Sequence, residues 1–145
     1  MRISRLEVLL SRNEGFLQEE PASTNAVLLP YVLHLNRPMI EEKCELIASY
    51  LDLRPRPGST ETSGFVCVVD WVAELSEQLS VPTSLADIGC SVTEEDAQTC
   101  AAKAFINPTG MTNPIALTEE DYAVLFRLAA AGSDPRGVRA AAGLE

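Results

Sequence analysis

Apolar residues recur along the chain at the three- and four-residue spacing of amphipathic helices, and no convincing stretch alternates as a half-buried strand does. The first such stretch is NAVLLPYVLHL, residues 25–35. Ser23, Thr24 or Asn25 can cap the free N–H groups at its start, and Pro30 predicts a kink or a late start of this helix.

A second helix is predicted directly after the first. Asn36 and Pro38 favour a helix start. The residues that follow place one apolar stripe at spacings of four, three and four: Ile40, Cys44, Ile47 and Leu51. The stretch 54–64 then combines two prolines and two glycines with polar residues, so we expect a loop there.

The third predicted helix covers residues 65–80 and ends before Pro82. Its apolar positions share one face: Val68, Val72, Leu75 and Leu79. Trp71, the single tryptophan, is interpreted as a packing anchor rather than a cofactor platform.

Two later helices are predicted from their starts. Thr93 and Thr118 each precede the residues Glu-Glu-Asp, so a hydroxyl stands at the cap and three acids fill the first turn, where the helix dipole favours negative charge. We interpret these acids as caps and not as catalytic carboxylate pairs. The last helix is expected to stop at Gly132.

These patterns predict an all-α fold, a bundle of five to six helices without internal repeats. We divide the chain into a divergent N-terminal lead-in at 1–22, a helical domain at 23–132 and a mobile tail at 133–145.

Composition narrows the class of protein. Hydrophobic residues make up 46% of the 145-residue chain and charged residues 22%, as in an ordinary globular domain. The net charge of −10 disfavours contact with nucleic acid or with an anionic membrane surface, since both would be repelled. No apolar run approaches the roughly 18 residues of a membrane span.

The cysteines and the N-terminus bear on the compartment. The four cysteines are too widely spaced for a CxxC pair and are expected to be reduced and mostly buried: Cys44, Cys67, Cys90 and Cys100. We therefore expect a cytoplasmic protein. Mitochondrial import is the alternative, because three arginines lie among apolar residues near the N-terminus; the acids Glu7 and Glu14 argue against it.

The residues offer little catalytic chemistry of their own. His34 is the only histidine, and one imidazole does not make a transition-metal site, so we expect a surface or half-buried side chain. Glu19 and Glu20 are expected to be solvated. No GxGxxG turn is present, and no serine or cysteine stands in a nucleophile elbow.

Three segments in order carry a resemblance. They are NAVLLPYVLHLN, SVPTSLADIGCSVTEED and NPTGMTNPIALTEEDYAVLF, the last covering residues 107–126. In sequence and spacing they resemble the C-terminal end of the iron-containing, metal-dependent alcohol dehydrogenase family, over about residues 23–131. The fold that this resemblance implies is the helical C-terminal domain of these enzymes, which is dehydroquinate synthase-like.

The resemblance implies a two-domain enzyme. Family members join a nucleotide-binding α/β domain to the helical domain and hold a divalent metal, iron or zinc, between them. The metal polarises the alcohol or carbonyl oxygen while NAD(P) exchanges hydride with the adjacent carbon.

The implied ligands are an aspartate and three histidines, one of them in a His-Gly-x-x-Asn motif before the apolar helix. Alignment on Asn25 puts this histidine at Pro21 and the glycine at Ala22. Proline offers a metal no lone pair, and residues 1–20 contain neither histidine nor aspartate. We therefore expect no catalytic, cofactor-binding or metal-binding residue, and no bound cofactor, in this chain.

Three functions remain open. The leading hypothesis is a truncated or divergent family member without autonomous dehydrogenase activity. The alternative is a binding or regulatory module that docks onto a full-length family member or a separate nucleotide-binding domain through exposed apolar surface, or that forms a homo-oligomer through it. An unrelated bundle with similar capping and turn chemistry is the third.

Overall fold

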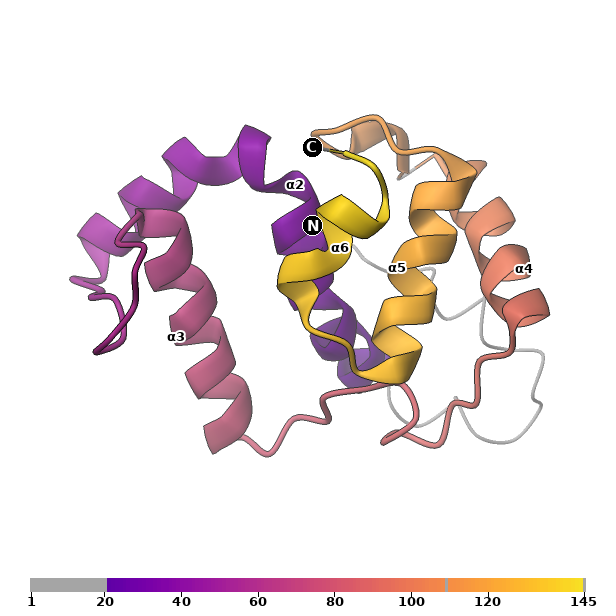
Figure 1. Cartoon of the computed structure of the whole chain (residues 1–145), viewed down its shortest axis with the longest axis horizontal. Helices are drawn as coiled ribbons and strands as arrows, with labels where there is room; N and C mark the ends of the chain where they lie inside the picture. The colour runs from indigo at the N-terminus through magenta and orange to yellow at the C-terminus, as the bar shows by residue number, and fades with distance from the viewer. Residues whose placement is uncertain (1–20, 109, 145) are drawn as a thin grey trace.

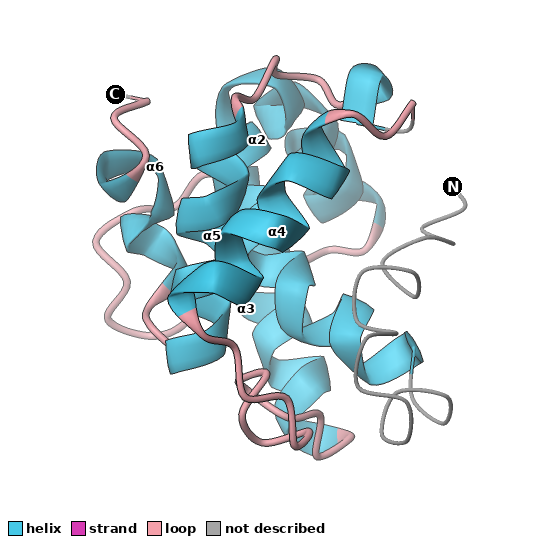
Figure 2. Ribbon diagram, turned by 90° about the vertical axis from the view of Figure 1, so that its right-hand side faces the viewer, coloured by secondary structure: helices cyan, strands magenta, loops and turns pink. Residues whose placement is uncertain are grey.

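The computed structural model describes residues 21–108 and 110–144, and these contain five α-helices and no strand (Figures 1 and 2). In chain order the elements are α2 (Pro21–Tyr50), α3 (Gly64–Gln78), α4 (Glu94–Phe105), the 3-10 turn η1 (Gly110–Thr112), α5 (Glu119–Ala131), the 3-10 turn η2 (Pro135–Gly137) and α6 (Val138–Ala141). The predicted all-α class is confirmed. Residues 1–20 of the predicted lead-in lie outside the described residues.

The helices pack around two separate apolar clusters. The larger one joins the first half of α2 to α4, α5 and α6, and its members include Tyr31, Leu35, Leu85, Ala129 and Val138. The smaller one joins the second half of α2 to α3 through Cys44, Ala48, Phe65, Cys67 and Val68. The α2–α3 pair, residues 37–79, therefore forms a hairpin at one end of the molecule (Figure 1).

The expectation of two helices between residues 21 and 50 is wrong, because α2 runs unbroken through Pro30 and Pro38. A proline inside a helix removes one backbone hydrogen bond. Side-chain donors reach carbonyl groups in the two turns before Pro38: Asn36 Nδ2 donates to Val32 O at 3.1 Å, and Arg139 Nη1 donates to Leu35 O at 2.8 Å. These bonds support the helix where it changes direction (Figure 1).

The start of α2 also differs from the prediction. The described part of α2 starts at Pro21, so the three residues expected as caps lie within the helix.

The predicted apolar stripes are covered only in part. In α2, Cys44 is buried as expected, but Ile47 and Leu51 are exposed and Ala48 is buried in their place. The spacing of the stripe predicts burial at every position only if a partner covers the whole length of the helix. Only one side of the second half of α2 meets α3.

In α3 the stripe is likewise covered at one end. Val68 is buried and Val72 half-buried, whereas Leu75 is 39% and Leu79 66% exposed. Trp71 is 39% exposed, so its expected role as a packing anchor is wrong. The packed positions of α3 lie between Phe65 and Val72, and beyond them α3 leads away from α2 (Figure 1).

Both predicted capping boxes are present. Thr93 caps α4 with Asp96 at the third helical position, and Thr118 caps α5 with Asp121 in the same way. Gly132 ends α5 in the left-handed conformation, with φ 60°. The acids in these turns therefore serve as caps, as predicted.

The described part of the tail packs against the helices, and the expectation that the tail is mobile stays a prediction. Residues 135–141 form η2 and α6, and Val138 is fully buried. The sequence signal was weak because the segment buries only this one large apolar side chain. The boundaries drawn at residues 22 and 132 stay predictions.

All four cysteines are free and buried, as predicted. Burial raises the pKa of the thiols of Cys44, Cys90 and Cys100, so these side chains behave as small apolar groups. Among the helices of the described residues, none combines the length and the apolar character that crossing a bilayer requires.

Candidate functional site

The N-terminal half of α2 is the segment on which the implied metal site would depend. Pro21 is its first residue, and it stands at the implied histidine position. A proline nitrogen in a peptide bond has no lone pair for a metal. Four residues later, Asn25 has a buried side-chain oxygen, Oδ1, without a hydrogen-bond partner.

This segment does not fit the divalent metal that the resemblance implies. One amide oxygen is a poor ligand for iron or zinc, which take imidazole, thiolate or carboxylate groups. Within residues 21–108 and 110–144, no three histidine, cysteine or acidic side chains converge in a way that would hold a metal. The expected absence of a bound metal stays a prediction, because other segments can supply ligands.

His34 lies further along α2 and makes packing contacts. It is half-buried, as predicted, and its ring meets Phe65 of α3 edge-on, with 5.3 Å between centroids and 78° between planes. The guanidinium of Arg37 lies 4.8 Å from the centre of the same Phe65 ring. Burial first, and then the nearby charge of Arg37, lower the pKa of His34, so the imidazole is neutral at neutral pH.

Tyr31 ties α2 to the end of α5. Its ring is buried, and its hydroxyl donates to Ser133 O at 2.7 Å, with Leu128 O 3.3 Å away. Leu128 lies in the last turn of α5, and Ser133 directly follows the C-cap of that helix, Gly132. A tyrosine in this place therefore serves packing and capping.

The turn after α4 is held by an amide pair. Nδ2 of Asn36 donates to Oδ1 of Asn113, and Nδ2 of Asn113 donates to Oδ1 of Asn36, both at 2.9 Å. Asn113 also donates to Ile115 O at 2.7 Å. The segment that carries the third quoted motif is thereby fixed to the middle of α2.

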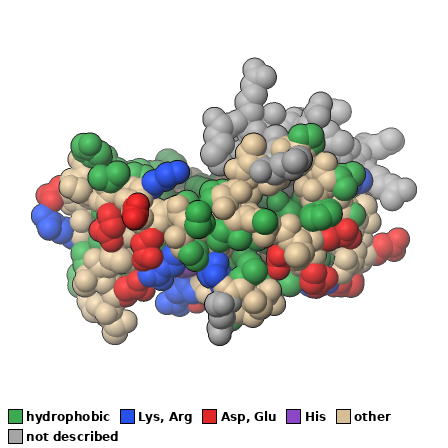
Figure 3. Space-filling model, turned by 90° about the horizontal axis from the view of Figure 1, so that it is seen from above, with side chains coloured by type: hydrophobic (Ala, Val, Ile, Leu, Met, Phe, Trp, Pro, Cys, Tyr) green, Lys and Arg blue, Asp and Glu red, His purple; other side chains and the backbone are tan. Residues whose placement is uncertain are grey.

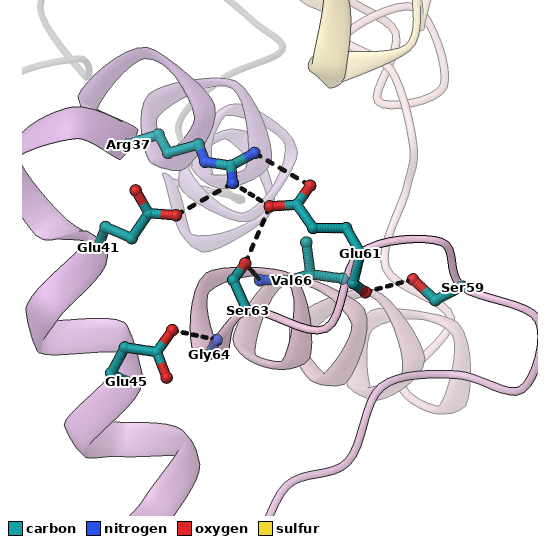
Figure 4. A network of polar contacts seen from close by, with 8 residues as sticks. All are labelled: Arg37, Glu41, Glu45, Ser59, Glu61, Ser63, Gly64 and Val66. Carbon is teal, nitrogen blue, oxygen red and sulfur yellow. Dashed lines mark hydrogen bonds and ion pairs between the residues drawn. The ribbon is translucent and has the colours of Figure 1, made fainter.

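A second polar network fastens the 51–63 loop to α2 (Figure 4). Arg37 bonds to Glu41 at 3.0 Å and to both carboxylate oxygens of Glu61. Ser63 donates to Glu61 at 3.0 Å, while its oxygen caps α3 by accepting from Val66 N. Hydrogen bonding to Arg37 lowers the pKa of Glu61, so the carboxylate stays charged.

The start of α3 touches α2 directly. Gly64 N donates to Glu45 Oε1 at 2.6 Å, so a carboxylate of one helix caps the N-terminus of the other. A Cβ on Gly64 would lie 2.5 Å from Glu45 Cα, closer than real atoms approach. Only glycine fits at this contact.

A shallow cavity of about 330 Å³ lies between the 86–93 turn, the start of α4 and the end of α5. Its lining includes four alanines, Cys90 and Arg127. Arg127 is already bound to both oxygens of Glu94 and to Glu120. An anion would meet these carboxylates, so the cavity offers no phosphate site.

None of these networks was predicted from the sequence. Asn36 was interpreted as a helix-entry residue, and Arg37, Glu61 and Asn113 were not singled out. Their partners lie 24 to 77 residues away along the chain, and no local pattern marks such pairs. His34 was placed correctly because a lone histidine on an apolar helix is a common packing residue.

Comparison with known proteins identifies the scaffold. The chain matches the family described as Fe-containing alcohol dehydrogenase family, C-terminal, over residues 16–130. No curated protein and no solved structure matches it. The match covers most of the chain, so the hypothesis of an unrelated bundle is wrong. The chain belongs to the iron-containing alcohol dehydrogenase family, and residues 16–130 correspond to the C-terminal domain of that family.

Proposed function

We propose that this domain keeps the helical scaffold of the family without the metal chemistry, and does not by itself interconvert alcohols and carbonyl compounds with NAD(P). The observation that carries the proposal is Pro21, which opens α2 at the position where the family motif places a histidine ligand. Without a metal to polarise the oxygen, the barrier to hydride transfer is not lowered in the family's way.

The nature of the other candidate ligands supports the same proposal. His34 lies thirteen residues after Pro21 in the sequence, and its ring packs against Phe65. The four thiols are buried in two different apolar clusters. Neither group is arranged to replace a family ligand.

The test is a cobalt(II) titration followed by visible absorption, with the wild-type protein beside the double variant Pro21→His, Ala22→Gly. The variant restores the His-Gly-x-x-Asn motif at residues 21–25 and nothing else. We expect no stoichiometric cobalt binding by the wild type, and weak binding at most by the variant, because one imidazole is a poor site. Tight stoichiometric binding by the wild type would contradict the proposal.

A second candidate function is docking onto a protein partner. This function is favoured by exposed large apolar side chains, most of which belong to the hairpin of α2 and α3. Hydrophobic groups are visible at that end of the molecule in Figure 3. Large exposed apolar patches usually mark interaction surfaces. A full-length family member, a separate nucleotide-binding domain and a second copy of this chain are the partners we consider. Co-elution with a full-length relative in size-exclusion chromatography tests this function.

A further inference from the structure

The apolar stripe of α3 extends beyond the surface that covers it. Val68 and Val72 pack against α2, and Leu75 and Leu79 continue the same face at spacings of three and four residues but are exposed. Trp71 lies beside them and is exposed as well. We call Trp71, Leu75 and Leu79 the open face of α3.

Apolar exposure is concentrated on the hairpin that carries the open face. Of the eleven large hydrophobic side chains exposed among the described residues, eight belong to the hairpin. They are Met39, Leu46, Ile47, Tyr50, Leu51, Trp71, Leu75 and Leu79. Single exposed apolar residues are ordinary on protein surfaces, but this concentration on one pair of helices is not.

The charges around the open face are acidic. Along its whole length α3 carries Asp70, Glu74 and Glu77 and not one basic residue. Arg56 of the loop lies 3.2 Å from Glu74 and 3.9 Å from Glu77, and the charge of Arg136 acts on Asp70. Two arginines do not neutralise three carboxylates.

This charge pattern selects among possible occupants. A second copy of the chain would bring another net charge of −10, and nucleic acid or anionic lipid would bring phosphate. A segment with Lys or Arg beside its own apolar stripe would match both the apolar face and its acidic border. Helices of that kind commonly bind to apolar helical surfaces through residues spaced like those of α3.

We propose that the open face of α3 binds an amphipathic helix of a partner protein, with an apolar stripe flanked by lysine or arginine. The inference rests on the docking function proposed above and names its surface and the chemistry of its partner. The acidic border sets the orientation and attracts the basic flanks, and burial of the three apolar side chains supplies the attraction at close range.

Trp71 provides a direct test, because it is the only tryptophan in the chain and belongs to the open face. The probe is a synthetic helix of leucine and lysine, about 15 residues long. A second helix with the same leucines and glutamate in place of lysine is the matched control. We expect the lysine helix to shift Trp71 emission to shorter wavelength in a saturable way, and the glutamate helix to have no effect.

Two variants locate the binding. Leu75→Ser with Leu79→Ser removes apolar surface at exposed positions and should abolish the shift. Ile106→Ser, an exposed apolar position outside the hairpin, should leave it unchanged. Circular dichroism checks that both variants stay folded.

Four results would overturn the proposal. They are no shift with the lysine helix, an equal shift with the glutamate helix, an undiminished shift in the leucine variant, and a shift that protein concentration alone produces. The last would mean that a second copy occupies the face. Co-elution of the leucine variant with a full-length relative would leave docking intact and place it elsewhere, and the cobalt titration does not depend on any of these results.

Discussion

Asn36 and Asn113 exchange two side-chain hydrogen bonds of 2.9 Å, which join the middle of α2 to the turn after α4 across 77 residues of sequence. Asn36 is buried, so its amide has little access to water. The pair also supplies a donor to Val32 O, in the part of α2 between Pro30 and Pro38. One reciprocal contact thus supports both the turn and the continuity of α2.

Replacing Asn36 with alanine should lower the free energy of unfolding by about 1–3 kcal/mol, because it leaves the Asn113 amide without its partner. Urea denaturation measures the change. The double variant Asn36→Ala, Asn113→Ala should lose less than the sum of the two single losses, since no unpaired partner then remains. Strictly additive losses would show that the amides act independently.

Gly64→Ala should weaken the hairpin. The new Cβ would lie 2.5 Å from the backbone of Glu45, and α3 has to move to make room. We expect a loss of about 1–3 kcal/mol, the usual range for overpacking. Gly137→Ala is the matched control, because no atom lies within 4 Å of its Cβ position and it should be neutral or slightly stabilising. Equal effects of both changes on the unfolding midpoint would refute the close contact.

The two capping boxes should differ in strength. Asp121, the acid of the second box, is buried, whereas Asp96 of the first is exposed. Thr118→Ala removes a donor 2.7 Å from the Asp121 carboxylate, and water cannot fully replace it. Loss of a cap lowers the free energy of unfolding by about 0.5–2 kcal/mol. We expect the loss for Thr118→Ala to lie near the upper end of this range and the loss for Thr93→Ala near its lower end. Thermal unfolding of the two variants compares them, and a larger loss for Thr93→Ala would contradict the burial argument.

Stability should fall as the pH drops below about 6.5. Burial lowers the pKa of His34 in the folded protein, so between its folded and unfolded pKa values the unfolded chain binds more protons. The free energy of unfolding therefore rises with pH in this range and falls with acidification. The salt-bridged acids Glu61 and Glu94, whose pKa values are lowered, contribute only at lower pH.

The measurement is urea unfolding at a series of pH values between about 7 and about 5.5, above the normal range of carboxylates. His34→Leu should remove most of the pH dependence in this window. A variant that retains the full dependence would assign it to another group.

Local features of the fold were readable from the sequence. Thr93, Thr118 and Gly132 mark helix ends through bonds to residues at most a few positions away, so the sequence alone predicts them. The resemblance to the family could be recognised for a different reason: three motifs in the same order are more specific than any single cap. The family match confirms it.

Features that depend on tertiary partners were not readable. Pro38 normally ends or begins a helix, but Arg139, a hundred residues away, helps to keep α2 continuous. The stripe of α3 placed Leu75 and Leu79 on one face with Val68 and Val72, but spacing shows only which residues share a face. Whether another element covers that face depends on how the helices cross.

Pro21 stands at the position where the family motif places a histidine ligand. The most direct measurement is the rate of NAD(P)-linked oxidation of short primary alcohols and diols by the purified protein, with iron or zinc added and metal content determined in the same sample. We predict no bound metal in stoichiometric amount and no turnover above the protein-free rate. One metal ion per chain together with turnover would show that other residues have built a substitute site, and would contradict the account.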